Sequence, residues 1–440
     1  MRRLDLTGST IAGVLSAGVA LCGLSSISAA QTVAQAVPEA PADAGNALYE
    51  GPKRGETVRE RSRPGYDPVG IRMGSFFLFP EIGVEEFYRD NIFYSDTGEE
   101  SDFVTVVEPR ASLKSNWDNH SLQFQGGVEA GRYLDNTSEN YVDWDFSADG
   151  RVDIQRGFAL TGGSWVERNH EDRRSVDQVG AGEPVTFYAY GLQAGAVKRF
   201  NRLYVRADLA SEWFAYDNVD AAGGGSFRSS DRDRRVLEGS VRSGYSVSER
   251  LEPFVELAVN DRSYDQRVDD NGFERDSQGW EATVGTAFDL TGVTFGEIYA
   301  GYLSQDYERD GFDTITGFSF GGALTWNPTG LTTVTAEAAR TVEETTLSGA
   351  SGALASAIDL RVDHELRRNV ILFGTAGYTM IEYQDISRDD DQVSAGLGVT
   401  YLANEFLKLD MSYSNAHRDS TANGSDYNTQ TVRFRVTGRL

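Results

Sequence analysis

The chain is poor in residues that several kinds of protein chemistry require. It has one cysteine, four histidines, four methionines and ten prolines among 440 residues. The single cysteine, Cys22, lies near the N-terminus, so the rest of the chain has no means of forming disulfides or cysteine-bound metal sites. Histidine is the usual general base, and it is scarce. The composition gives little support for an enzyme.

Long apolar runs and an excess of positive charge are also missing. A transmembrane helix needs about 20 apolar residues, and no stretch after residue 24 approaches that length. A helical membrane protein is therefore excluded. Lys and Arg total 41 against 67 Asp and Glu, a net charge of −26. Because nucleic acids are bound through basic side chains, this balance argues against a nucleic-acid partner.

The N-terminus predicts a secretory signal peptide over residues 1–30. Arg2 and Arg3 form a positive start, residues 11–24 are apolar, and residues 28–30 (Ser-Ala-Ala) fit a cleavage site. The residues before Cys22 match a lipoprotein signal poorly. Residues 31–70 are rich in Ala, Pro and charge without periodicity, which predicts a flexible periplasmic leader.

The most informative feature that is present is alternation. From Tyr141 to Ile154 the chain reads YVDWDFSADGRVDI, with apolar and polar residues taking turns. A period of two is typical of a strand with one apolar face and one wet face. Four aspartates lie on the polar face, and unpaired buried charge is too costly for a packed core. That face must contact water.

Short turns and longer polar loops alternate through the remaining chain. Eight turns are predicted at residues 118–119, 156–157, 200–202, 248–250, 291–292, 327–330, 367–369 and 403–405. Nine polar loops are predicted at 95–102, 135–140, 171–184, 218–231, 266–276, 308–313, 348–356, 385–390 and 418–426. This order predicts an all-β antiparallel outer-membrane β-barrel of about 18 strands over residues 71–440, with periplasmic turns and extracellular loops.

A soluble β-sandwich would show the same alternation, so other features must decide. Aromatic residues gather near the predicted strand ends, as at the two interfaces of a bilayer. The last residues place Val432, Phe434, Val436 and Leu440 on one face, similar to the C-terminal strand of outer-membrane barrels. The polar face carries too many charges for a sealed core. The expected partners are outer-membrane lipid, lipopolysaccharide and the barrel assembly machinery.

A barrel of this size encloses an aqueous channel. The charged residues at inward positions are the pore-lining candidates: Glu129, Asp143, Asp145, Asp149, Arg151, Asp153, Arg202, Arg206, Asp208, Glu212, Glu238, Arg242, Glu256, Asp359, Arg361, Asp363, Glu365, Lys408, Arg433 and Arg435. Their acidic excess favours cations or neutral solutes over anions. For most of them taken singly, the favoured interpretation is a solvated wall charge paired with a neighbour.

Three further features are candidate functional sites. The third long loop, 171–184, could constrict the lumen as in general porins, but it is short for that role and is expected to stay outside. The acidic loops 96–102 and 269–276 match no EF-hand, so hydrated surface charge is favoured and neither metal nor cofactor is predicted. Nothing places a nucleophile beside His170 or His417, and no catalytic residue is predicted.

Residues 80–93, PEIGVEEFYRDNIF, carry a family resemblance. A first barrel strand ending in Tyr-x-Asp-Asn-Ile resembles the putative beta-barrel porin type 2 family, and residues 66–76, 135–141, 170–173 and 200–202 agree with it. Members of that family are often associated with exopolysaccharide or capsule assembly. The resemblance therefore implies export of a polysaccharide through the outer membrane, with periplasmic export proteins as partners. Inward aromatics such as Tyr141, Phe214 and Tyr216 could stack on sugars, although aromatics near a barrel rim need no ligand.

Three functions remain open on the sequence alone. One is a porin-like channel for exopolysaccharide or capsule export. The second is a general or selective diffusion porin for small polar or cationic solutes. The third is a structural or adhesive surface barrel with no transport role.

Overall fold

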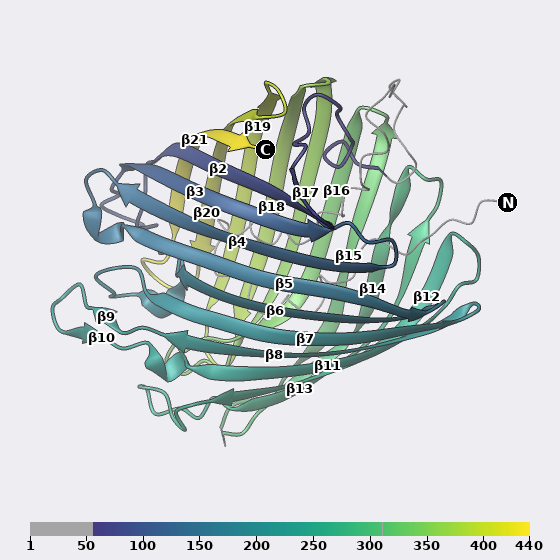
Figure 1. Ribbon diagram of the computed structural model, residues 1–440. Helices are drawn as coiled ribbons and strands as arrows, with labels where there is room; N and C mark the ends of the chain where they lie inside the picture. The colour runs from purple at the N-terminus through teal and green to yellow at the C-terminus, as the bar shows by residue number, and fades with distance from the viewer. Residues whose placement is uncertain (1–55, 310) are drawn as a thin grey trace.

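The computed structural model describes residues 56–309 and 311–440, and shows a closed antiparallel β-barrel (Figure 1). The predicted signal peptide and residues 31–55 of the predicted leader lie outside the described residues. A short strand, β1 (Ile71–Met73), pairs only with the start of the first wall strand. The wall itself has 18 strands, as the sequence predicts.

The wall strands have nearly uniform lengths, which suits a barrel that spans a layer of constant thickness. They are β2 (Phe76–Arg89), β3 (Asp102–Ser115), β4 (His120–Tyr133), β5 (Tyr141–Gln155), β6 (Phe158–His170), β7 (Thr186–Phe200), β8 (Leu203–Tyr216), β11 (Arg234–Tyr245), β12 (Leu251–Tyr264), β13 (Ser277–Asp289), β14 (Thr294–Tyr307), β15 (Ile315–Thr329), β16 (Thr332–Glu343), β17 (Ala353–Arg367), β18 (Val370–Tyr383), β19 (Asp389–Leu402), β20 (Leu407–Ser420) and β21 (Tyr427–Arg439).

Each wall strand pairs with its neighbours in the chain, and β2 pairs with β21 to close the circuit. Short turns gather at one end of the barrel and long loops at the other (Figure 1). One predicted turn is shifted: Asn327 to Thr329 belong to β15, and the turn is Gly330–Leu331, after a register shift between Trp326 and Thr329. Loop 217–233 contains a small hairpin of β9 (Val219–Asp220) and β10 (Ser226–Phe227), which lies at the lower left in Figure 1.

The apolar face of each strand points outward. On β5, Val142, Phe146, Val152 and Ile154 are all exposed, between 38% and 52% of their surface. A soluble protein would not leave such a row uncovered, whereas lipid would cover it. Four aromatics near the loop end, Phe214, Tyr264, Tyr307 and Tyr383, face inward and are buried inside the barrel mouth, as the sequence predicts for Phe214. No helix among the described residues is long and apolar enough to cross a membrane.

Glycines on the inner wall make room for aromatic rings. Six rings each lie over a glycine that is the direct cross-strand partner of the aromatic residue. The pairs are Tyr141/Gly131, Trp165/Gly191, Tyr204/Gly244, Phe254/Gly285, Tyr299/Gly321 and Phe373/Gly398. A Cβ on Gly191 would come within 2.1 Å of the Trp165 ring. The rings therefore lie along the wall and do not project across the lumen.

We expect Gly191→Ala to destabilise the barrel by about 1–3 kcal/mol, because the added methyl displaces the Trp165 ring from a packed site. The measurement is the temperature at which the folded form is lost on gel electrophoresis of heated samples. Gly162→Ala, on the neighbouring strand, is the control, since its Cβ would meet nothing closer than 3.8 Å. Equal loss of stability in both variants would contradict the packing of the Trp165 ring over Gly191.

Candidate functional site

The lumen wall holds the residues predicted to line the pore. All the candidates except Arg202 lie on strands, on the face opposite the exposed apolar side chains. Arg202 lies in the turn between β7 and β8 and is not on the wall. Contact of these residues with a permeating solute stays a prediction.

Many of the wall charges are paired, often with the next residue on the same face of one strand. Arg206 contacts Asp208 at 2.6 Å, Arg361 contacts Asp363 at 2.9 Å, and Lys408 contacts Asp410 at 3.2 Å. Arg242 contacts both Glu256 and Glu297, from β12 and β14, at 2.6 and 2.9 Å. Because residues two apart share a face, such pairs neutralise the wall without any long-range contact.

Four carboxylates on one side of the lumen have no such partner. Glu167, Glu212, Glu238 and Glu281 lie on β6, β8, β11 and β13, and among the described residues none has a basic side chain within ion-pair distance. Glu281 accepts a hydrogen bond from the Ser319 hydroxyl. Glu238, Glu256 and Glu281 border a groove in the wall, together with Asn260 and Tyr299. This side of the lumen is therefore negatively charged.

The sequence identified Glu212 and Glu238 but missed Glu167 and Glu281. Both missed residues follow stretches in which glycine, serine or alanine interrupts the alternation: TGGSWVE and GWE. Their partners in the register, Asp145 for Glu167 and Ala258 for Glu281, lie on strands whose inward face is clear. Pairing each strand with its neighbour in register would have predicted that Glu167 and Glu281 face inward.

The third long loop, residues 171–185, crosses the lumen. It leaves the wall between β6 and β7, and Val176 packs against Ala353, Ile381 and Tyr383 on β17 and β18. Those strands lie half-way round the 18-strand circuit. The expectation that this loop stays outside the lumen was wrong.

Buried ion pairs fix the base of the loop. Glu171 binds the Arg232 guanidinium through two hydrogen bonds, of 2.7 and 3.0 Å, and both side chains are about 95% buried. Arg173 makes a second two-point pair with Glu139 of the neighbouring loop, at 2.7 Å for each bond. Two-point pairs of this kind fix orientation as well as distance.

The far part of the loop is bound to the opposite wall. One oxygen of Asp177 accepts hydrogen bonds from Thr345 Oγ1 at 2.8 Å and from the Thr346 backbone N–H at 2.9 Å. Arg418, on β20, donates to the backbone carbonyl of Arg174 at 3.1 Å. The loop is therefore held from both sides of the barrel, and it divides the lumen.

The pKa values of the two acids at the start of the loop are shifted in opposite directions. Burial raises the pKa of Glu171 above its usual value, although Arg232 opposes that shift. Burial would also raise the pKa of Asp172, but the Arg174 and Arg89 guanidiniums outweigh it, so this pKa lies well below its usual value. Asp172 is therefore ionised at neutral pH and holds Arg174 in the loop.

We expect Asp177→Asn to loosen the far end of the loop, because the amide is a weaker acceptor than the carboxylate for the Thr345 and Thr346 donors. Single-channel conductance in a planar bilayer should rise or become noisier. Glu183→Gln is the matched control: it removes the same charge from an exposed position in the same loop. Identical traces from both variants would show that the contact does not hold the constriction.

At the turn end, the segment 56–70 lies against the inside of the barrel mouth. Arg61 and Arg63 both bind Glu365 of β17, at 3.1 and 3.0 Å, and all three side chains are buried. The Val58 backbone N–H donates to Thr333 Oγ1 at 2.9 Å. This part of the predicted flexible leader is packed structure, because two arginines satisfy one inward carboxylate. Figure 1 shows it as the purple segment beside β16 and β17.

We expect Glu365→Gln to release this segment. Removing one partner of a buried ion pair costs about 3–5 kcal/mol, and here it leaves Arg63 without its carboxylate partner and Arg61 with only the 3.9 Å pair to Glu56. Limited trypsin digestion should then cleave after Arg59 or Arg61 faster than in the parent protein. Glu60→Gln, on the exposed side of the same segment, should leave the digestion rate unchanged; a matching rise there would contradict the role of Glu365.

No group of three or more His, Cys, Asp or Glu in the described part of the chain is arranged to hold a metal ion.

A closed 18-strand barrel with an apolar outside and a charged lumen defines an outer-membrane β-barrel of the porin kind. Residues 63–440 match the family described as putative beta-barrel porin 2, and the chain belongs to that family. The protein is therefore located in the outer membrane. The family is one of porins, which indicates a channel.

Comparison with curated proteins gives no match. Among solved structures, similar folds come from Pseudomonas aeruginosa. A mutant of the ferric enterobactin receptor PfeA has a TM-score of 0.44 at 7% identity, covering 82% of this chain and 80% of that one. The outer-membrane protein OpdK has a TM-score of 0.43 at 12% identity, covering 82% and 98%. OccK9 (OpdG) has a TM-score of 0.44 at 11% identity, covering 83% and 98%.

Proposed function

We propose that the protein is a diffusion channel for small polar solutes, with a preference for cations and neutral solutes over anions. The observation that carries this proposal is the third loop. It crosses the lumen and is bound to the opposite wall, so that only small solutes pass beside it. A polymer would require the whole set of loop contacts to break.

The preference for cations rests on the unpaired carboxylates. Paired wall charges contribute little net field, because each arginine lies beside its own acid. Glu167, Glu212, Glu238 and Glu281 are left to set the sign of the potential on their side of the lumen. A ring or arc of carboxylates raises the local concentration of cations and lowers that of anions.

A second candidate is the export of a polysaccharide, which the family resemblance implies. The observation that favours it is the Tyr299 ring of β14, which lies along the wall over Gly321 and borders the groove, where a sugar ring could stack on it. The Tyr204 and Phe254 rings are buried, and the Arg242 guanidinium lies 4.0 Å from the centre of the Phe254 ring, so neither ring is open to a sugar. The loop constriction argues against this candidate unless the loop moves.

The test is conductance in a planar bilayer under a salt gradient. We expect a reversal potential of the sign for cation preference. Changing Glu167, Glu212, Glu238 and Glu281 together to Gln should lower the cation-to-anion permeability ratio by roughly twofold or more. Glu249→Gln, in an exposed periplasmic turn, is the control for a distant charge change.

Other outcomes separate the remaining functions. Anion preference in the parent protein would overturn the proposal. Absence of any conductance would favour a structural or adhesive barrel. Conductance that a neutral polysaccharide blocks from the periplasmic side, but small sugars do not, would favour export.

A further inference from the structure

The barrel wall is interrupted between β15 and β16. β14 and β15 are paired as far as Ile315, and β16 and β17 are paired as far as Glu343. The pairing of β15 with β16, however, ends at Gly321 and Ala339. In the described chain, residues 315–320 and 340–343 thus face each other across a seam without ladder hydrogen bonds. A Cβ at Gly322, the next residue, would lie 2.4 Å from the Glu297 carbonyl oxygen.

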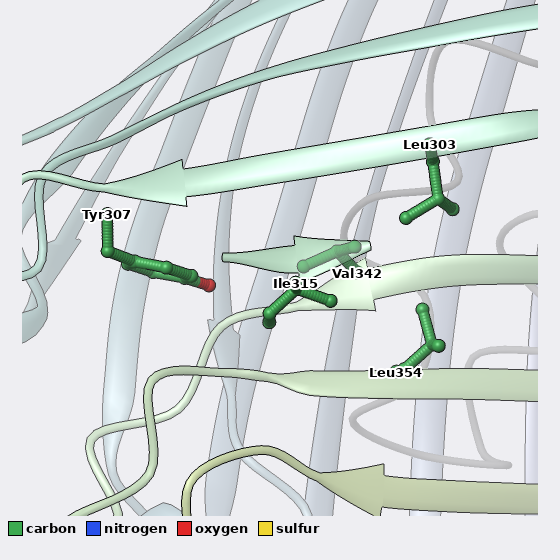
Figure 2. Close-up of a cluster of buried hydrophobic side chains, with 5 residues drawn as sticks. All are labelled: Leu303, Tyr307, Ile315, Val342 and Leu354. Atoms are coloured by element: carbon green, nitrogen blue, oxygen red, sulfur yellow. The ribbon is translucent and has the colours of Figure 1, made fainter. Parts of the chain in front are cut away.

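The end of β16 is displaced into the lumen at this seam. By their positions along the strands, Val342 and Leu354 should face outward. Ile358 and Leu360, which lie on the same face of β17 as Leu354, are exposed to the outside. Both are nevertheless buried, and they pack against Leu303 and Ile315, which point inward from β14 and β15. Figure 2 shows these side chains, with Tyr307, pointing toward one another between the strands.

Polar contacts hold the displaced end. Arg262, on β12, donates to the backbone carbonyl of Val342 at 3.2 Å and binds the Glu344 carboxylate. Tyr264 donates its hydroxyl to Glu344 at 2.7 Å. One backbone carbonyl of the β16 edge, that of Val342, is therefore satisfied from inside the barrel, and not by β15.

The seam lies at the depth of the outer aromatic girdle. Phe318 on β15 is 57% exposed to the outside, and Tyr302, its register partner on β14, is 48% exposed. Trp280 follows on β13. An unpaired strand edge at lipid depth is costly unless it lines a polar passage. The aromatic girdle marks the level at which headgroups meet acyl chains.

Unsatisfied polar atoms cluster along the seam. The Thr341 and Ser356 hydroxyls and Arg340 Nε are buried without a hydrogen-bond partner in the described structure. Arg340 also pairs with Glu382 at 2.7 Å. The β16 and β17 side of the seam thus carries free donors and acceptors, and an apolar cluster of Leu303, Tyr307, Ile315, Val342 and Leu354 bridges the seam between β14–β15 and β16–β17.

We propose that this seam is a lateral passage for an amphiphile with one acyl-type chain. The chain enters among the apolar cluster, while the headgroup bonds with the free polar atoms of β16 and β17. The passage connects the outer leaflet with the lumen. It is separate from the axial path of the proposed diffusion channel, because its contacts lie in the wall.

The test is photolabelling in lipid vesicles with a palmitic acid that carries a diazirine near the end of its chain. Mapped label is expected on the lipid-facing Phe318 and Val284, and also on the inward Leu303 and Ile315. Ser319→Cys with Thr341→Cys, joined by a short bismaleimide, pins the seam, and no native cysteine of the predicted mature chain interferes. Inward label should fall at least fivefold, while Phe318 label stays unchanged.

Two controls keep the result interpretable. Thr325→Cys with Thr335→Cys, joined in the same way, lies where β15 and β16 are paired and should leave inward labelling intact. Val342→Asp puts a charge in the apolar path and should lower the label on Leu303 without cross-linking. Label confined to lipid-facing residues in the parent protein, or inward label unaffected by both changes, would overturn the passage. Conductance of the parent protein tests the diffusion channel separately.

Discussion

Lipid offers no hydrogen bonds, so every backbone N–H and C=O at membrane depth must find a partner within the protein. The wall meets this requirement strand by strand, and the pairing of β2 with β21 completes it by removing the last two edges. The strict alternation of the sequence follows from the same constraint, since a closed sheet has one face toward lipid and one toward water. The interrupted pairing of β15 and β16 is informative for this reason: it leaves two strand ends without ladder hydrogen bonds to each other, and an arginine from β12 supplies one of the missing donors.

The interior obeys a second rule, that charge must be paired where water is scarce. Where loops and the N-terminal segment cover the wall, the acids have guanidinium partners: Glu171 with Arg232, and Glu365 with Arg61 and Arg63. Where the wall is open, as at Glu212 and Glu238, carboxylates stand without them. Paired charge therefore marks the elements that are fixed, and unpaired charge marks the surface left to solutes.

Alternation and turn spacing predicted the class of fold, the strand number and the face of nearly every charged candidate, because each depends on residues close together in the chain. The contacts that shape the lumen could not be predicted in this way. Asp177 meets Thr345, and Arg61 meets Glu365, across separations of 168 and 304 residues. The segment 56–70 has the composition of a linker, and only the position of Glu365 on the inner wall makes it structure. The prediction that Arg202 lines the pore was wrong for a simpler reason: Arg202 belongs to the turn, and β8 begins only at Leu203.

The third loop is too short for a constriction only if it must cross the lumen without help from the opposite side. The seven residues from Glu171 to Asp177 are six Cα–Cα steps apart end to end and reach at most roughly 20 Å when extended. The tip of the β16–β17 hairpin is displaced inward, and it brings Thr345 and Thr346 toward Asp177. Two short elements therefore meet where neither would span the lumen alone. The displacement that opens the seam between β15 and β16 also supplies the anchor for the constriction. A change that restored the pairing of those strands would thus withdraw the anchor, coupling the lateral seam to the axial path through one hairpin.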